Sequence, residues 1–97
     1  MLSKADQLKI VAICEKHGRY LVSDEMYRDL EADPVMRLPA ACDLYSKGVS
    51  LCGVSKALSC PGLRIGWLAC RDEAIMNRFC ELKDFTTICS SAPSETL

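Results

Sequence analysis

Two basic side chains, Lys56 and Arg64, stand eight residues apart in the stretch Ser55–Trp67, with a Pro-Gly pair between them. The apolar run 49–54 precedes this stretch and the run 65–70 ends beyond it; both are expected to be short buried strands bounded by glycine and proline. Lys56 therefore comes where a strand ends. Because fully buried lysines are rare, its ammonium is expected either to point into solvent or to be held against a partner.

A second set of polar residues, Asp24, Glu25 and Tyr27, follows the apolar segment 20–23, which is predicted to be a strand. Ligands of open α/β sheets bind beyond the carboxyl ends of the strands, so these side chains are placed where a site is expected. A strand that ends in an acidic pair also suggests the magnesium site of a nucleotide hydrolase. The chain has no G-x-x-x-x-G-K-[ST] phosphate loop, which argues against that alternative.

The first element along the chain is predicted to be a helix, capped by Ser3 or Asp6 and ended by Gly18. His17, the only histidine, lies in the last turn, where its charge is favourable to the helix dipole rather than a sign of catalysis. The residues predicted to form the core face of this helix are Leu8, Val11, Ala12 and Cys14.

Segment 38–45 is predicted to form a short helix with Pro39 in its first turn and Gly48 at its end. Segment 72–85 has helical apolar spacing, and residues 90–95 form a loop that leads to a new helix start. Trp67 is expected in the core. A helix followed by a strand is the first half of a parallel repeat, so the order of elements predicts an α/β fold.

Composition indicates an ordinary globular protein. The 97 residues suffice for one domain, and a net charge of −1 with 49% hydrophobic residues argues against nucleic acid as a partner. No apolar stretch resembles a signal peptide or a membrane span, so a soluble, cytoplasmic protein is expected. Seven cysteines without a C-x-x-C pair favour neither disulfides nor a metal site; Cys52 and Cys70 are expected to be small buried hydrophobes.

The chain resembles the class I and II aminotransferases, which are pyridoxal-phosphate enzymes of fold type I. The resemblance is carried by Asp24-Glu25-Met26-Tyr27, by Ser55-Lys56, and by the segment 61–67, which reads P-G-L-R-I-G-W. It implies a partial large domain of that fold, with about three strands, two parallel and the third antiparallel, flanked by helices.

The resemblance also implies roles for single residues. Lys56 would form a Schiff base with the cofactor aldehyde and then act as the catalytic base. Asp24 would pair with the pyridine nitrogen, and Tyr27 would hydrogen-bond the phenolic oxygen. Ser55 and Arg64 would bind the phosphate, the arginine through a forked contact. Judged only by type and position, the two basic residues would be solvated turn charges, Tyr27 a packed aromatic and Asp24 a turn or cap residue.

The sequence departs from the family pattern in places. Gly53 stands where many members carry a second phosphate-binding serine or threonine. The family's upstream phosphate loop, ring-stacking aromatic, asparagine and downstream carboxylate-binding arginine have no counterpart. Residues 1–97 are therefore expected to be a single segment of a longer enzyme's large domain, and a helix that starts near the last residue supports this expectation.

The expected activity is transfer of an amino group between an amino acid and a 2-oxo acid through pyridoxal phosphate, in an enzyme that forms a homodimer at full length. A β-lyase or an aminocyclopropane-forming synthase on the same fold is an alternative, because the residues present serve the cofactor and hardly touch the substrate. A non-catalytic remnant used for binding or assembly is a second alternative.

Overall fold

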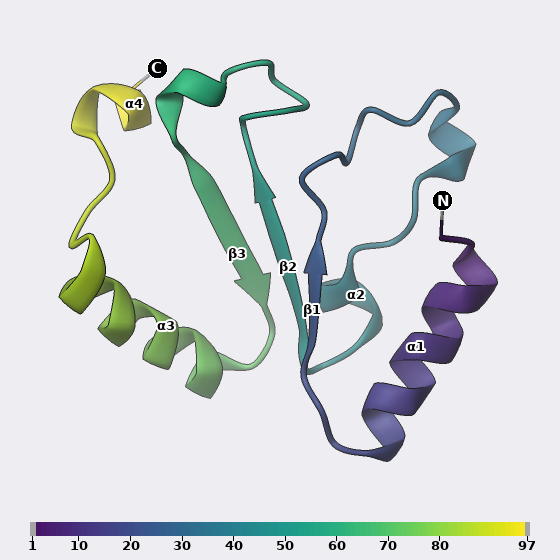
Figure 1. The fold of residues 1–97 in the computed structure, drawn as a ribbon. Helices are drawn as coiled ribbons and strands as arrows, with labels where there is room; N and C mark the ends of the chain where they lie inside the picture. The colour runs from purple at the N-terminus through teal and green to yellow at the C-terminus, as the bar shows by residue number, and fades with distance from the viewer. Residues whose placement is uncertain (1, 97) are drawn as a thin grey trace.

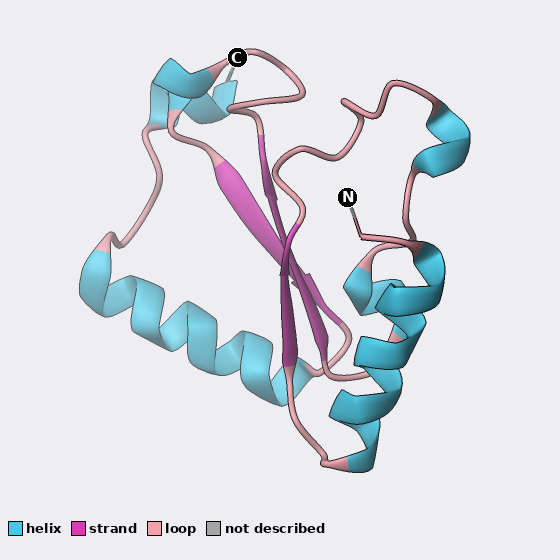
Figure 2. Ribbon diagram, turned by 45° about the vertical axis from the view of Figure 1, so that its right-hand side comes forward, coloured by secondary structure: helices cyan, strands magenta, loops and turns pink. Residues whose placement is uncertain are grey.

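A three-stranded sheet forms the centre of the computed structural model, which describes residues 2–96. Strand β1 (Leu21–Asp24) pairs in parallel with β2 (Gly48–Gly53), and β2 pairs antiparallel with β3 (Gly66–Cys70), as Figure 1 shows. In the two ribbon views the sheet stands between α1 and α3 (Figures 1 and 2). The predicted α/β class, with two parallel strands and an antiparallel third, is confirmed.

Helix α1 (Lys4–Lys16) begins and ends where the sequence predicts. The Ser3 hydroxyl oxygen accepts a hydrogen bond from the backbone N–H of Asp6 at 3.1 Å and so caps the first turn. His17 is the residue that follows the last turn, and Gly18 adopts a φ of 61°, a conformation that costs glycine little.

The predicted core face of α1 is only partly right. Val11 is buried, but Leu8 and Ala12 are exposed, and the polar Gln7 is buried instead. Gln7 can be buried because its amide donates a hydrogen bond to the carbonyl of Pro39 at 2.8 Å. This contact holds α1 against the segment before the second helix.

The second helix is shorter than predicted, since α2 covers only Ala41–Leu44 of the segment 38–45. Pro39 lies before the helix and not in its first turn. Gly48 does not end the helix but begins β2, and the reason for glycine there is steric: a Cβ atom would collide with the carbonyl oxygen of Ala41. The close packing of α2 on β2 depends on that glycine.

The core is small and lies between α1, α2 and β2. The Tyr45 hydroxyl is bonded within it, donating to the carbonyls of Cys14 and Arg19 at 3.3 and 3.0 Å. These bonds fix the chain between α1 and β1 against α2. The buried hydrophobic side chains of the described residues are Val11, Ala41, Tyr45 and Val49.

Strand β3 is less buried than predicted. Trp67, expected in the core, is 48% exposed. The reason is that β3 lies at an edge of the described sheet, paired only with β2, and its first two residues are exposed. A cavity of about 330 Å³, lined by Leu68, Phe79 and Lys83 among others, separates the sheet from α3.

Helix α3 (Glu73–Thr86) agrees with the predicted segment 72–85. Its cap is Asp72, whose Oδ1 accepts hydrogen bonds from the backbone N–H groups of Ala74 and Ile75 at 3.0 and 3.3 Å. A new helix does follow, but it begins at residue 92, inside the segment 90–95 that was predicted to be a loop. The remaining helical segments are the 3₁₀ turns η1 (Pro34–Met36) and η2 (Pro61–Leu63) and the short α4 (Ala92–Thr96).

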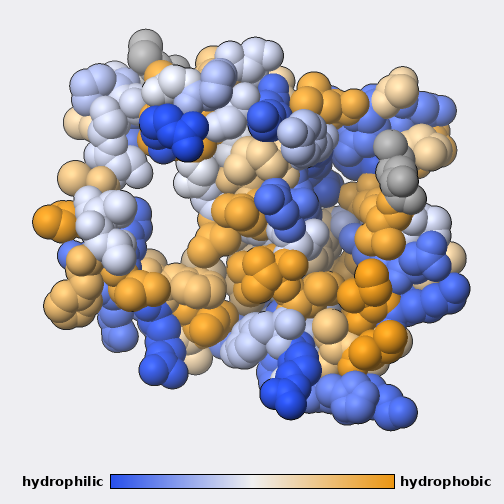
Figure 3. All heavy atoms as spheres, viewed as in Figure 1, coloured by the Kyte–Doolittle hydropathy of each residue, from blue (hydrophilic) through white to orange (hydrophobic). Residues whose placement is uncertain are grey.

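The described chain is more open than a closed domain of its length. Its radius of gyration is 15.0 Å, against about 12.5 Å for a compact chain of this size. Its accessible surface is 7127 Å², against about 5,500 Å² expected. Figure 3 shows an opening on one face between the α3–α4 segment and the sheet, with hydrophobic side chains below it and on the side of the sheet.

Within residues 2–96, all seven cysteines are free thiols, and no cluster of three or more histidine, cysteine or acidic side chains is arranged to hold a metal ion. Cys52 and Cys70 are half-buried rather than buried. None of the described helices has the length and apolar character needed to cross a membrane.

Candidate functional site

The topology brings the predicted site residues to one edge of the sheet. Strands β1 and β2 are parallel, so both end at the same edge, and the antiparallel β3 starts there (Figure 1). Asp24 is the last residue of β1, Ser55 and Lys56 come two and three residues after the end of β2, and Arg64 comes two residues before β3. This edge is the usual position of ligand sites in open α/β sheets.

The loop between β2 and β3 is closed at its base by backbone hydrogen bonds. The N–H of Val54 donates to the carbonyl of Ile65 at 3.2 Å, and the N–H of Cys60 donates to the carbonyl of Val54 at 3.1 Å. Ser55 follows and Arg64 precedes the first of these pairs. The two residues predicted to share a phosphate therefore flank one rung of the ladder.

Gly53 and Gly66 face each other at the last pair of this ladder. A Cβ atom on Gly53 would lie 2.8 Å from the carbonyl oxygen of Ile65, and one on Gly66 would lie 2.9 Å from that of Cys52. The backbones approach too closely for side chains at either position. A serine or threonine two positions before Ser55 would therefore require β2 and β3 to move apart at this pair.

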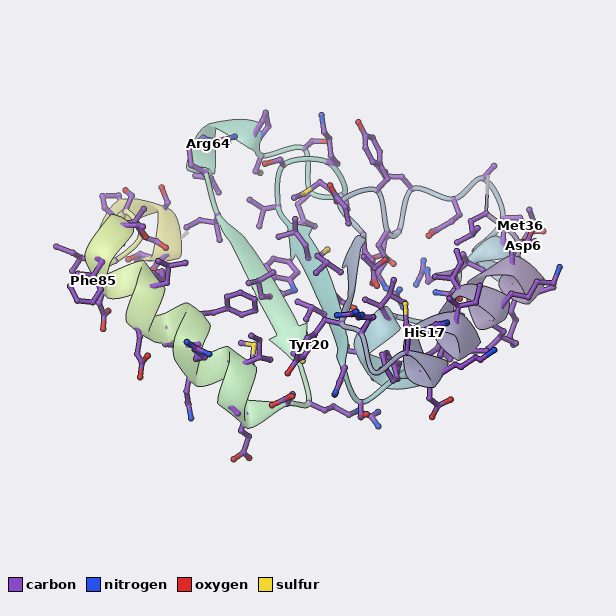
Figure 4. All side chains as sticks on the ribbon, turned by 60° about the horizontal axis from the view of Figure 1, so that its bottom comes forward. Asp6, His17, Tyr20, Met36, Arg64 and Phe85 are labelled. Carbon is purple, nitrogen blue, oxygen red and sulfur yellow. The ribbon has the colours of Figure 1, made fainter. Side chains whose placement is uncertain are left out.

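Arg64 projects from the turn that η2 makes before β3, as Figure 4 shows. Its backbone is left-handed, with φ of 56° and ψ of 36°, a conformation that is unfavourable for a residue with a Cβ. One Nη1 hydrogen bond to the Pro61 carbonyl at 3.0 Å steadies the side chain. The guanidinium is exposed, and no carboxylate of residues 2–96 forms an ion pair with it.

Of the two expected positions for the Lys56 ammonium, in solvent or against a partner, the structure shows the second. Its Nζ lies 5.5 Å from the centroid of the Tyr27 ring. Both residues are exposed, and a cation–π contact in such a place is worth about 0.5–1 kcal/mol. Among the described acidic groups, none lies within ion-pair distance of Lys56. The contact joins the loop after β1 to the loop after β2.

Asp24 is exposed, and its Oδ1 accepts a hydrogen bond from the N–H of Met26 at 3.0 Å. This local bond starts the turn that leads to Tyr27, whose carbonyl accepts a bond from the N–H of Leu30 at 3.2 Å. No hydrogen bond within residues 2–96 uses the Asp24 Oδ2 or the Tyr27 hydroxyl. Both atoms can bind a ligand.

Glu25 was placed by the sequence at the expected site but was given no role by the family resemblance, and it has more side-chain contacts than any of the predicted site residues. Its Oε1 accepts from the backbone N–H of Ala41 at 2.9 Å and from the Ser50 hydroxyl at 2.8 Å, and its Oε2 lies 3.3 Å from Arg28. Side chains alternate along a strand, so the residue after an exposed Asp24 faces inward. That alternation, together with a serine at position 50 inside a buried strand, was the signal in the sequence that could have predicted an inward-facing Glu25.

A cavity of about 310 Å³ adjoins this edge, between the end of β1, the start of α1 and the loop around η1. Asp24 and Tyr27 line it, but Ser55, Lys56 and Arg64 do not. The cavity therefore takes in two of the five predicted site residues, and the other three lie outside it. The Lys56 contact with Tyr27 marks the boundary between the two groups.

The fold is similar to those of solved aminotransferases. For a PLP-dependent aminotransferase from Streptococcus suis 89-1591, the TM-score is 0.86 at 28% identity, over 99% of this chain and 25% of that protein. For a PLP-bound putative aminotransferase from Clostridium difficile 630, the TM-score is 0.82 at 19% identity, over 93% of this chain and 24% of that protein. The second likeness shows the fold alone.

Among curated proteins, an uncharacterized HTH-type transcriptional regulator of Bacillus subtilis (strain 168), YdfD, is 31% identical over 96 residues. The match covers 98% of this chain and 20% of that protein, so the chain spans about a fifth to a quarter of the length of these relatives. The family described as aminotransferase class I and II matches residues 1–96. The chain therefore belongs to the class I and II aminotransferase family.

Proposed function

We propose that this chain forms part of the pyridoxal-phosphate site of an aminotransferase, which exchanges an amino group between an amino acid and a 2-oxo acid. The observation that carries the proposal is the meeting of Asp24, Tyr27, Ser55, Lys56 and Arg64 at one edge of the sheet, with the Lys56 ammonium over the Tyr27 ring. In this proposal residues 1–97 are one segment of the large domain of a cytoplasmic homodimer.

The polar groups at this edge fit the cofactor. When bound, pyridoxal phosphate supplies an aldehyde that an amine can attack and a ring that accepts electrons from the substrate. The free Oδ2 of Asp24 suits a protonated ring nitrogen, and the free hydroxyl of Tyr27 suits the oxygen on the ring. The exposed Arg64 guanidinium and the Ser55 hydroxyl suit a phosphate.

Lys56 is the residue that we assign to catalysis. Its Nζ is the attachment point for the cofactor, and once released it takes the proton from the substrate α-carbon. The Tyr27 ring holds this amine at the border between the cavity and the site residues outside it. Attack on the aldehyde requires the neutral form of this amine.

Covalent labelling tests this proposal. The chain is incubated with about one equivalent of pyridoxal phosphate, reduced with borohydride and mapped by mass spectrometry, and we expect the pyridoxyl mass on Lys56. Lys47 is the matched control, because it also lies near an aromatic ring, that of Tyr20 at 5.6 Å. Label that spreads evenly over both lysines would contradict a preformed site.

Reaction specificity requires a separate experiment, because a β-lyase or synthase of the same fold would use the same cofactor residues. The longer protein that carries this chain is supplied with amino acids and a 2-oxo acid acceptor. A new amino acid is the result expected of an aminotransferase. Ammonia and pyruvate without a new amino acid would favour the lyase.

A second candidate function is a non-catalytic binding unit. The observation that favours it is the 31% identity to a protein described as an HTH-type transcriptional regulator. In that case Lys56 still takes up the cofactor, but no amino-group transfer follows. Selective labelling of Lys56 without turnover of any amino acid, in the longer protein that carries this chain, would support this candidate over the enzyme.

A further inference from the structure

We infer that Glu25 is a positioning residue, which fixes the distance and orientation between Asp24 and Tyr27 on one side of the site and Lys56 on the other. The inference rests on the proposed cofactor roles of these three residues. Glu25 lines the same cavity as Asp24 and Tyr27, but its side chain is only 12% exposed, and its carboxylate oxygens are bonded to α2, β2 and Arg28. It acts through the elements that it ties together.

The carboxylate of Glu25 joins four segments of the chain. Its Oε1 receives the backbone N–H of Ala41, in the first turn of α2, at 2.9 Å and the hydroxyl of Ser50, in β2, at 2.8 Å. Its Oε2 lies 3.3 Å from Nη1 of Arg28, and the same Nη1 donates to the carbonyl of Leu38 at 3.0 Å. Glu25 thereby connects the end of β1, the loop after it, α2 and β2.

The backbone of Glu25 is held as firmly as its side chain. Its N–H donates to the carbonyl of Leu51 at 2.8 Å, which extends the β1–β2 ladder one step past Asp24. Its carbonyl accepts from the N–H of Arg28 at 2.9 Å and from the Cys52 thiol at 3.6 Å. The turn that carries Tyr27 therefore starts from a residue fixed on both sides.

The partners of Glu25 in β2 lie on the segment that leads to Lys56. Ser50 is almost fully buried, and Cys52 comes four residues before Lys56. Ser50 also receives the N–H of Cys42 at 3.2 Å, so its hydroxyl is oriented by two neighbours. If Glu25 lost its acceptor oxygen, two donors inside the fold would be left unpaired and β1 could shift along β2.

A pair of variants separates an acceptor role from simple filling of space. Glu25→Gln keeps a side-chain oxygen for Ala41 and Ser50, whereas Glu25→Leu has similar size and no acceptor. Glu31→Leu is the matched control, because Glu31 is a half-buried carboxylate in the same loop that pairs with Arg37 at 3.4 Å. Ser50→Ala is a milder variant that removes one donor to Glu25 and serves if the leucine variant does not fold.

Each variant of the chain is labelled with pyridoxal phosphate, reduced and mapped, and the label on Lys56 is divided by the label on Lys47. We expect Glu25→Gln to stay within about twofold of wild type, and Glu25→Leu to lose about tenfold, since displacements near 1 Å have large effects on reaction geometry. Ser50→Ala falls between them, and Glu31→Leu matches wild type. A folded Glu25→Leu variant with wild-type selectivity would overturn the inference.

Amide hydrogen exchange separates failure of this inference from failure of the proposed function, because it needs no cofactor. We expect Glu25→Leu, but not Glu25→Gln, to speed exchange at Met26 and Ala41 while Met76 in α3 stays unchanged. This pattern without selective label on wild-type Lys56 would keep the role of Glu25 and overturn the cofactor assignment. Unchanged exchange at Met26 and Ala41 in the leucine variant would overturn the role of Glu25.

Discussion

Arg64 combines an unfavourable backbone with an exposed charge. Its left-handed conformation would suit glycine or asparagine, yet the position holds a large basic side chain whose guanidinium faces solvent. Residues in such conformations persist where the surrounding structure fixes them, often at ligand sites. The hydrogen-bonded base of the β2–β3 loop supplies that support through Val54 and Ile65.

Replacing this residue tests the forked phosphate contact. Arg64→Lys keeps the charge and the same left-handed strain, but loses the two parallel N–H donors. We expect the affinity for pyridoxal phosphate, measured by equilibrium titration, to fall about tenfold, with no change in thermal unfolding. Arg71→Lys, an exposed arginine elsewhere, is the control. Equal affinities for the two variants would count against the phosphate role of Arg64.

At the scale of elements, the site depends on the narrow approach of β2 and β3. Gly53→Ala would place a methyl group 2.8 Å from the carbonyl oxygen of Ile65. We expect it to destabilise the chain by about 1–3 kcal/mol, measured by urea unfolding, and to shift the loop that holds Ser55. Gly62→Ala in the same loop meets no atom within 4 Å and should be nearly neutral.

The capping of α3 makes its stability depend on pH. The Tyr20 hydroxyl donates to Asp72 Oδ2 at 2.6 Å, and this bond, with the N–H groups of Ile75 and Ala74, lowers the pKa of Asp72 from its usual 3.8. A folded-state pKa below the unfolded value means that this stabilisation is complete above about pH 4 and is lost as pH falls through the folded-state pKa. Circular dichroism between pH 5 and pH 2 follows the loss.

Asp72→Asn is the control for that acid transition. Asparagine still accepts the capping bonds but does not titrate in this range, so the variant should lose helix signal less steeply below pH 4. The same Tyr20 bond raises the pKa of Tyr20, so its stabilising effect is present below about pH 10 and is lost at higher pH. An identical acid profile for both proteins would show that Asp72 does not control it.

Local signals predicted the elements better than they predicted burial. Caps and glycines act within a few residues, so Ser3, Gly18 and Asp72 mark helix boundaries in the sequence. Burial depends on what packs from far along the chain, and for that reason Leu8 and Trp67, which are exposed, were wrongly predicted to lie in the core. The sequence motif identified the candidate site residues, but the contacts that these residues make could be found only from the folded structure.

Glu25 shows the same limit within the site. Its partners Ala41 and Ser50 lie sixteen and twenty-five residues away, and no local pattern connects them. Gly53 was recognised as a departure from the family, but its steric reason became visible only when β3 was placed beside β2. The contacts of Glu25 and the need for glycine at position 53 both follow from how the elements pack, which the sequence motif does not show.

For the whole molecule, the exposed apolar surface is the feature with the clearest consequence. Phe85 is 90% exposed and Ile88, just after α3, is 73% exposed, whereas Val49 is almost completely buried. Apolar patches of this kind favour association. The chain by itself is expected to bind a hydrophobic dye and to associate as its concentration rises.

Two variants compare the effect on stability of an exposed apolar side chain with that of a buried one. Phe85→Ser should reduce dye binding and association, measured by sedimentation, and change the free energy of unfolding by less than about 0.5 kcal/mol. Val49→Ala should cost about 2 kcal/mol, because it opens a cavity in a small core. Loss of stability in Phe85→Ser comparable to that in Val49→Ala would show that the helix packs more closely than the structure indicates.

The most direct test of the central claim compares pyridoxal phosphate with 5′-deoxypyridoxal, which has the same free aldehyde and no phosphate. If Ser55 and Arg64 bind the phosphate while Lys56 meets the aldehyde, removing the phosphate should lower reductive labelling of Lys56 about tenfold or more. Labelling of Lys47 should change far less. Equal labelling of Lys56 by both aldehydes would contradict a cofactor site at this edge of the sheet.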